Sequence, residues 1–141
     1  KNHWPEGQAS YEVDHISLPP CRLDPKPVQN PHNPMRIGGH SLPGLRRAAR
    51  FGNGWYGFNL SPSATATMLQ KLDVELQKQN KSREDFEIVI TPLPNASPST
   101  VQEYRALGVD RLVLHLGNQK PERVEKRLAE VALFIEQAAS T

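Results

Sequence analysis

A regular alternation of two hydrophobic patterns runs through most of this chain and constrains its fold more than any other feature. Four short apolar segments each precede a longer segment in which apolar residues recur at helical spacing. This predicts strands at 35–37, 54–58, 86–90 and 109–116. It predicts helices at 42–51, 62–80, 99–107 and 121–138, the third opening at Ser97 or Ser99. Strands that alternate with helices form a parallel sheet with right-handed crossovers.

Capping residues mark the ends of the predicted helices. Ser41 and the pair Ser61-Pro62 are typical of helix N-termini, because the serine hydroxyl accepts a backbone N–H and proline suits the first turn. Gly52 and Gly108 follow the first and third predicted helices, where glycine is the usual C-terminal residue. The alternation is therefore supported by local signals as well as by periodicity.

The first 34 residues have a different texture. Residues 11–16 alternate apolar and polar side chains, which predicts a short exposed strand. The segment 18–34 then holds six of the 13 prolines: Pro19, Pro20, Pro25, Pro27, Pro31 and Pro34. Proline lacks a backbone N–H and restricts the residue before it, so this segment is expected to be extended and irregular. The chain thus divides into a proline-rich lead-in, 1–34, and four βα units, 35–141.

Length and charge exclude several classes of protein. The 141 residues correspond to one domain and fall far short of the roughly 250 residues of a complete eight-stranded α/β barrel. The 17 basic and 15 acidic residues nearly balance, and no basic stripe appears, so we expect no nucleic-acid partner. No apolar run is long enough to cross a membrane and no signal-peptide pattern opens the chain, so we expect a cytoplasmic protein.

Metal and thiol chemistry find little support in the sequence. Cys21 is the only cysteine, which excludes an intrachain disulfide and a thiolate cluster. His3, His15 and His32 are not spaced as metal ligands, so we expect no metal site. Nothing indicates a serine or cysteine nucleophile with a positioned base.

The first predicted strand ends in Gly38-Gly39-His40-Ser41, at the start of a helix. Glycine allows a ligand to approach the backbone closely, and the exposed N–H groups of a helix N-terminus favour an anion such as phosphate. Ser41 adds a hydroxyl donor. An ordinary strand-to-helix turn with an N-cap serine explains the same residues equally well.

The neighbouring segments favour the ligand-binding interpretation of this turn over the ordinary one. Pro25-Lys26-Pro27-Val28-Gln29 leads toward the turn, and Gly52-Asn53-Gly54-Trp55 follows the first helix with its Arg47-Ala48-Ala49. Leu107-Gly108-Val109-Asp110-Arg111 precedes the last strand. Together these motifs resemble the luciferase-like monooxygenase family, which includes flavin-dependent monooxygenases and oxidoreductases that use the deazaflavin coenzyme F420. The resemblance spans about residues 8–135, and 25–56 is its specific part.

Two positions depart from the family pattern. Asn53 stands where the family usually has aspartate, so the charge is lost but a hydrogen-bonding side chain remains. Arg36 lies inside the first predicted strand, where an apolar residue is usual. Trp55 follows a glycine in a predicted buried strand, so we expect it to be a core residue and not a platform for the flavin. For Arg46, Arg47 and Arg50 we favour a solvated or inter-subunit helix face over a phosphate site.

The resemblance implies a fold and a set of site residues. Family members are eight-stranded barrels, and these segments look like strands five to eight. The chain therefore resembles half of a TIM-type (β/α)8 barrel, four parallel βα units with a proline-rich N-terminal extension. By resemblance, the phosphate of FMN or coenzyme F420 would be bound by Gly38, Gly39, His40 and Ser41. Barrel chemistry lies at the carboxyl ends of strands, where we expect pocket or substrate residues at Asn59, Thr91 and His115.

Two functional interpretations remain open. In the first, the chain is the C-terminal half of a flavin- or F420-dependent oxidoreductase that contributes the phosphate-binding turn and is not catalytic alone. In the second, it is a non-catalytic half-barrel module that self-associates or binds a phosphorylated ligand or a protein partner. A half-barrel exposes two strand edges, so either interpretation predicts a homo-oligomer that completes the barrel or a missing N-terminal half. The sequence identifies neither a catalytic residue, nor the substrate, nor which cofactor binds.

Overall fold

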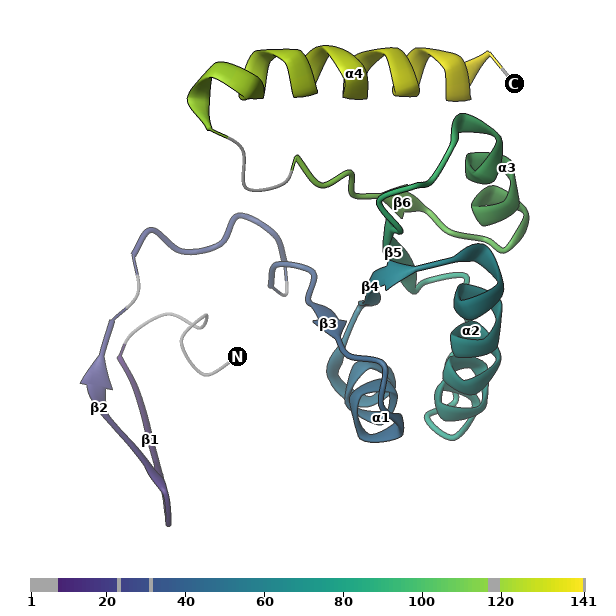
Figure 1. The fold of residues 1–141 in the computed structure, drawn as a ribbon. Coiled ribbons are helices and arrows are strands. Elements are labelled where there is room, and N and C mark those ends of the chain that lie inside the picture. Colours follow the sequence, from purple (N-terminus) through teal and green to yellow (C-terminus); the bar gives the residue numbers. More distant parts are fainter. Residues whose placement is uncertain (1–7, 23, 31, 117–119, 141) are drawn as a thin grey trace. The chain divides into compact units, whose positions relative to one another are not determined.

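The structure is a computed structural model that describes residues 8–22, 24–30, 32–116 and 120–140 (Figure 1). It contains two compact units, one ending at Pro34 and the other beginning at Met35. In the first unit, β1 (Ala9–Val13) and β2 (Ile16–Cys21) pair antiparallel. The single strand predicted at 11–16 was wrong, because a two-residue turn divides it into the two arms of a hairpin.

The rest of the first unit has little regular structure. Pro19 and Pro20 lie within β2, which belongs to a two-stranded sheet and is therefore an edge strand, where proline is tolerated. After Cys21 the described residues of this unit form no helix or strand. Pro31 lies outside the described residues.

The second unit contains a parallel four-stranded sheet, as predicted. Its strands, in spatial order, are β3 (Arg36–Gly38), β4 (Gly54–Leu60), β5 (Glu87–Pro92) and β6 (Arg111–Leu112). The helices that follow them are α1 (Leu42–Phe51), α2 (Pro62–Gln77), α3 (Pro98–Ala106) and α4 (Pro121–Ala139). Each strand pairs in parallel with the next strand along the chain, as expected of successive βα units.

The last strand is much shorter than the predicted segment 109–116. Ile88 and Ile90 direct their backbone groups toward β6, because their carbonyls accept from Asp110 N–H (3.0 Å) and Val113 N–H (2.9 Å). The next residue of β5 to face β6 is Pro92, which has no N–H to donate. The ladder therefore ends here although Val113, Leu114 and Leu116 after it are apolar.

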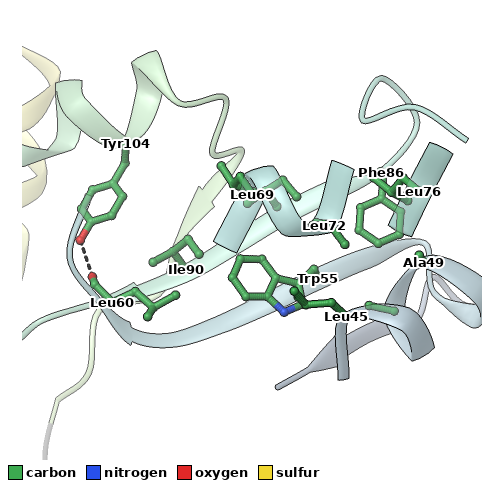
Figure 2. Close-up of a cluster of buried hydrophobic side chains, with 12 residues drawn as sticks. Leu45, Ala49, Trp55, Leu60, Leu69, Leu72, Leu76, Phe86, Ile90 and Tyr104 are labelled. Carbon is green, nitrogen blue, oxygen red and sulfur yellow. Dashed lines mark hydrogen bonds between the residues drawn. The ribbon is translucent and has the colours of Figure 1, made fainter. Parts of the chain in front are cut away.

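The core lies on one face of the sheet. Side chains alternate between faces along a strand, and the strands contribute to the core Ile37, Trp55, Ile88 and Ile90. Helices α1, α2 and α3 contribute Leu45, Ala48, Leu69, Leu72, Leu76 and Tyr104. Figure 2 shows the Trp55 indole among these helix side chains, and Trp55 is fully buried, as expected of a core residue.

The opposite face of the sheet carries five polar residues besides Val89 and Phe58. The same alternation places on it Arg36, Tyr56, Glu87, Thr91 and Arg111. We call these five residues the polar face.

Helix α4 packs against α3 (Figure 1) and buries Ala138 near its C-terminal end. None of the described helices combines the length and the apolar character needed to cross a lipid bilayer.

Candidate functional site

Three residues named from the sequence lie around one cavity of about 890 Å³. Asn59 and Thr91 come from the carboxyl-terminal ends of β4 and β5, and His115 comes from the segment after β6. Helix α4 forms the remaining wall. The other lining residues are Phe58, Pro92, Leu93, Pro94, Ala96, Leu114, Leu116, Arg123, Lys126, Arg127, Glu130, Val131 and Phe134. The four residues of the glycine turn, Gly38 to Ser41, do not line this cavity.

Asn59 occupies a strained position at the cavity wall. Its φ is 58°, in the left-handed region that asparagine tolerates better than most side chains. The pairing with β5 shifts here, since Phe58 lies opposite Thr91 and Leu60 opposite Pro92, which makes Asn59 the extra residue of a bulge. The bulge returns the Leu60 side chain to the core while Asn59 lines the cavity.

A buried hydrogen bond holds this bulge from behind. The Tyr104 hydroxyl on α3 donates to the carbonyl oxygen of Leu60 at 2.6 Å (Figure 2). Burial raises the pKa of the Tyr104 phenol above its ordinary value, and the charge of Glu103 raises it further. The protonated form that donates this bond is therefore the favoured form.

Thr91 is buried, and its hydroxyl has a partner. Thr91 Oγ1 lies 2.7 Å from the Tyr56 hydroxyl oxygen, and either group can donate. Both side chains belong to the polar face, one strand apart. Sequence reasoning did not single out Tyr56, because an aromatic residue in a short strand is typical of a core position.

The glycine turn is built as an N-terminal helix cap. Gly39 has a φ of 125°, which side-chain-bearing residues rarely adopt, and its carbonyl accepts from Trp55 Nε1–H at 2.9 Å. Ser41 Oγ accepts from Gly44 N–H at 3.3 Å. Among the described residues, no acceptor faces the N–H groups of His40, Ser41 and Leu42. The turn therefore presents three amide donors outward at the positive end of the α1 dipole.

His40 links this turn to the cavity wall. Its Nε2 accepts from the backbone N–H of Phe58 at 3.1 Å, so Nε2 is the unprotonated nitrogen of the ring. Its ring also meets Trp55 edge-on, with 6.2 Å between centroids. His40 thus positions the turn against β4, next to Asn59.

The remaining motif residues lie at the amino ends of the strands and make structural contacts. Asn53 Oδ1 accepts from Met35 N–H at 3.2 Å, and Asp110 Oδ2 accepts from Ile88 N–H at 2.7 Å. Asn53 thus binds the residue just before β3, and Asp110 binds the backbone of β5. An amide oxygen serves this purpose as a carboxylate oxygen would, which explains how the chain accommodates asparagine at position 53.

Arg36, unusual in its strand, belongs to an ion-pair network. It pairs with Glu87 across β4, and Arg111 Nε lies 3.2 Å from the same carboxylate. Gly54 lies between Arg36 and Glu87 in register, and a Cβ there would stand 2.6 Å from the Glu87 carbonyl oxygen. The absence of a side chain at Gly54 therefore makes room for Arg36 and Glu87 to pair across β4.

The arginines of α1 make ion-pair and cation–π contacts on the helix surface. Arg46 Nε lies 3.4 Å from a carboxylate oxygen of Glu75, and Arg50 stacks over the Phe51 ring at 4.8 Å. Hydrogen bonding by Lys78 is the main reason why the pKa of Glu75 is lowered.

Sequence reasoning missed the basic residues of α4. Arg123, Lys126 and Arg127 are three and four positions apart, which places them on one helix face, and this spacing was the available signal. Among the described residues, no three His, Cys, Asp or Glu side chains form a group that could hold a metal ion. His3 lies outside the described residues.

Comparison with known proteins gives a family match and two similar folds. The family model described as luciferase-like monooxygenase matches residues 1–132. An F420-dependent secondary alcohol dehydrogenase, solved with an F420–acetone adduct, is similar with a TM-score of 0.70 and 12% identity over 96% of this chain and 58% of that one. A coenzyme F420-dependent tetrahydromethanopterin reductase from Methanopyrus kandleri gives 0.67 and 10% over 94% and 60%.

At these identities the two structures show likeness of fold alone, and this chain spans about three fifths of the length of each. No curated protein sequence matches this chain.

Proposed function

Because the chain belongs to the luciferase-like monooxygenase family, we propose that it is the C-terminal half of a barrel oxidoreductase that uses coenzyme F420 or FMN. One observation carries the proposal: Asn59, Thr91 and His115, from three successive βα units, surround a single cavity at the carboxyl ends of the strands. Active sites of α/β barrels lie at this end. Both similar structures are of F420-dependent enzymes, which favours F420 over FMN.

The glycine turn is our candidate for the cofactor phosphate site. The outward N–H groups of His40, Ser41 and Leu42, together with the lack of a side chain at Gly38 and Gly39, fit a phosphate group. The Ser41 hydroxyl oxygen accepts a hydrogen bond in the helix cap, and its O–H can donate to a ligand. A bound flavin or deazaflavin would carry the electrons, while these residues would bind and orient it.

Completion of the barrel requires further strands. β3 and β6 are the outer strands of the sheet, and unpaired edges of this kind favour pairing with another chain. We propose that a second copy of the chain or an N-terminal half covers them. Light scattering tests the first option, because self-completion requires a dimer or a higher assembly, whereas a compact monomer at all concentrations would exclude it.

Cofactor binding tests the phosphate site. Titration with F420 and with FMN, followed by fluorescence quenching, should show saturable binding that weakens about tenfold in Ser41→Ala, since one hydrogen bond to a charged group is lost. Ser61→Ala is the matched control, because Ser61 caps α2 through Ala64 N–H at 3.2 Å in the same way.

Equal weakening in both variants would show that only helix capping was lost and would contradict the phosphate site. Absence of binding by either cofactor would instead favour the non-catalytic module.

A further inference from the structure

The charged residues of α4 are unevenly distributed around the helix. All three of its basic side chains, Arg123, Lys126 and Arg127, line the cavity at the carboxyl ends of the strands. Of its described acidic side chains, only Glu130 does so, whereas Glu125 and Glu136 do not. The α4 wall of the cavity is therefore positively charged.

Among the described residues, only part of this charge is neutralised. Arg127 Nη1 lies 2.9 Å from a carboxylate oxygen of Glu130. Within the described part of the chain, no carboxylate partner faces Arg123 or Lys126. Arg123 and Lys126 can therefore both pair with an external anion at this wall.

The walls opposite α4 contribute no carboxylate to compensate these two cations. Asn59 and Thr91 supply neutral polar groups, and the surrounding side chains are largely apolar and include Phe58, Leu93 and Leu114. A cavity of about 890 Å³ lies within the size range of small-molecule sites. The cavity therefore suits a molecule with a flat apolar body and one acidic end.

We propose that this cavity binds an organic anion, with its carboxylate or phosphate on Arg123 and Lys126 and its apolar body against Phe58 and Leu93. The proposal deepens the proposed function, because it names the chemical class of ligand for the same cavity. It also distinguishes two anion sites. The glycine turn would bind the cofactor phosphate, and the α4 wall would bind the acid group of the ligand in the cavity.

The test uses 2-naphthoate as a probe and 2-naphthamide as its uncharged counterpart, each titrated into the full chain and followed by amide NMR shifts. Naphthoate should bind more tightly than naphthamide, with its largest shifts at cavity residues. Arg123→Gln/Lys126→Gln should weaken naphthoate about tenfold and leave naphthamide unchanged, because only the charge-assisted contacts are lost. The matched control, Arg47→Gln/Lys71→Gln, removes the same charge from exposed positions on α1 and α2.

Equal weakening in the control would reduce the effect to overall charge and overturn the proposal, as would equal affinity for the two probes. Neither outcome touches the Ser41 test, so the two proposals fail separately. A parallel titration with FMN and riboflavin identifies the source of the anion. Loss of FMN affinity alone in Arg123→Gln/Lys126→Gln would place the cofactor phosphate on the α4 wall and overturn the separation of the two anion sites, whereas an unchanged FMN affinity supports the acid group of a substrate as the anion bound there.

Discussion

The two ends of the parallel sheet are built on opposite principles. At the amino ends of the strands, the polar groups are paired within the chain, as in the network of Arg36, Glu87 and Arg111. At the carboxyl ends, Gly39 and Asn59 hold positive φ values and an open cavity lies alongside. The amino end is therefore closed by contacts between its own side chains. The carboxyl end has outward backbone N–H donors, two residues with positive φ and a cavity.

This difference separates stability from function along the strand axis. In α/β barrels the amino-terminal face stabilises the fold and the carboxyl-terminal face carries the chemistry. Residues that hold backbone in uncommon conformations are concentrated at functional sites. Substitutions at the amino ends should therefore cost mainly stability, and substitutions at the carboxyl ends should cost mainly binding.

The largest effect is expected for Gly54→Ala. A Cβ at this position would lie 2.6 Å from the Glu87 carbonyl oxygen and 3.3 Å from Arg36 Cγ, so the backbone of β4 or β5 must move. We expect a loss of about 3 kcal/mol in the free energy of unfolding, measured by urea denaturation. Gly38→Ala is the control, because its Cβ would meet nothing closer than 3.7 Å. Equal losses in the two variants would remove the claim that the amino end is the tightly packed one.

Tyr104→Phe should have the next largest effect and is the exception at the carboxyl end. It deletes the bond to the Leu60 carbonyl and leaves a buried acceptor unpaired, which costs about 2 kcal/mol. Tyr56→Phe loses the part-buried bond to the Thr91 hydroxyl and should cost less, about 1 kcal/mol. Denaturation curves that rank the two variants in the reverse order would show that the bulge does not depend on Tyr104.

The same tyrosine predicts an alkaline limit to stability. Its pKa is raised in the folded chain, so the folded state retains the phenolic proton more strongly than the unfolded state. The stabilisation is fully present below the unfolded pKa of about 10 and is lost as the pH rises through the folded pKa. The free energy of unfolding should fall above about pH 10 in the parent chain and fall less steeply in Tyr104→Phe. Parallel curves for the two proteins would contradict this linkage.

Glu87→Gln tests the ion-pair network itself and should cost about 1 kcal/mol, because all three members of the network are partly exposed. Since the remaining Arg36 and Arg111 then repel each other, the loss should be largest at low salt and shrink at high salt. Unfolding measured at both ionic strengths checks this. A salt-independent loss would mean that packing around Glu87, not its charge, closes the amino end.

The sequence predicted the parts of the fold that depend on local patterns. The four βα units, the Ser41 and Ser61 caps and the left-handed Gly108 each follow from periodicity or from one residue's conformational preference. The short β6 was missed because its length is limited by Pro92, a residue of a different strand. Local pattern reading does not reveal which strand a proline will face.

The candidate site likewise contains residues that local sequence patterns predict and residues that depend on tertiary packing. Asn59, Thr91 and His115 were named because strand ends meet at one edge of a parallel sheet, and the structure places them around one cavity. The α4 wall was missed because the strand-end rule considers strands only, whereas this wall depends on how a helix packs beside them. The pairing of Tyr56 with Thr91 depends on the register of β4 against β5, which no single segment encodes.

The smallest effect on stability, and the sharpest test of the comparison, is expected for Asn59→Gly. Glycine relieves the positive φ of 58° but adds backbone freedom to the unfolded chain by about 0.4–1 kcal/mol, so the two effects nearly cancel. Stability should stay within about 0.5 kcal/mol, while naphthoate binding in the cavity weakens because a side chain that lines the cavity is lost. A clear loss of stability with unchanged binding would place Asn59 with the amino-end residues in function, and the separation of the two ends would fail at the residue where strain and cavity meet.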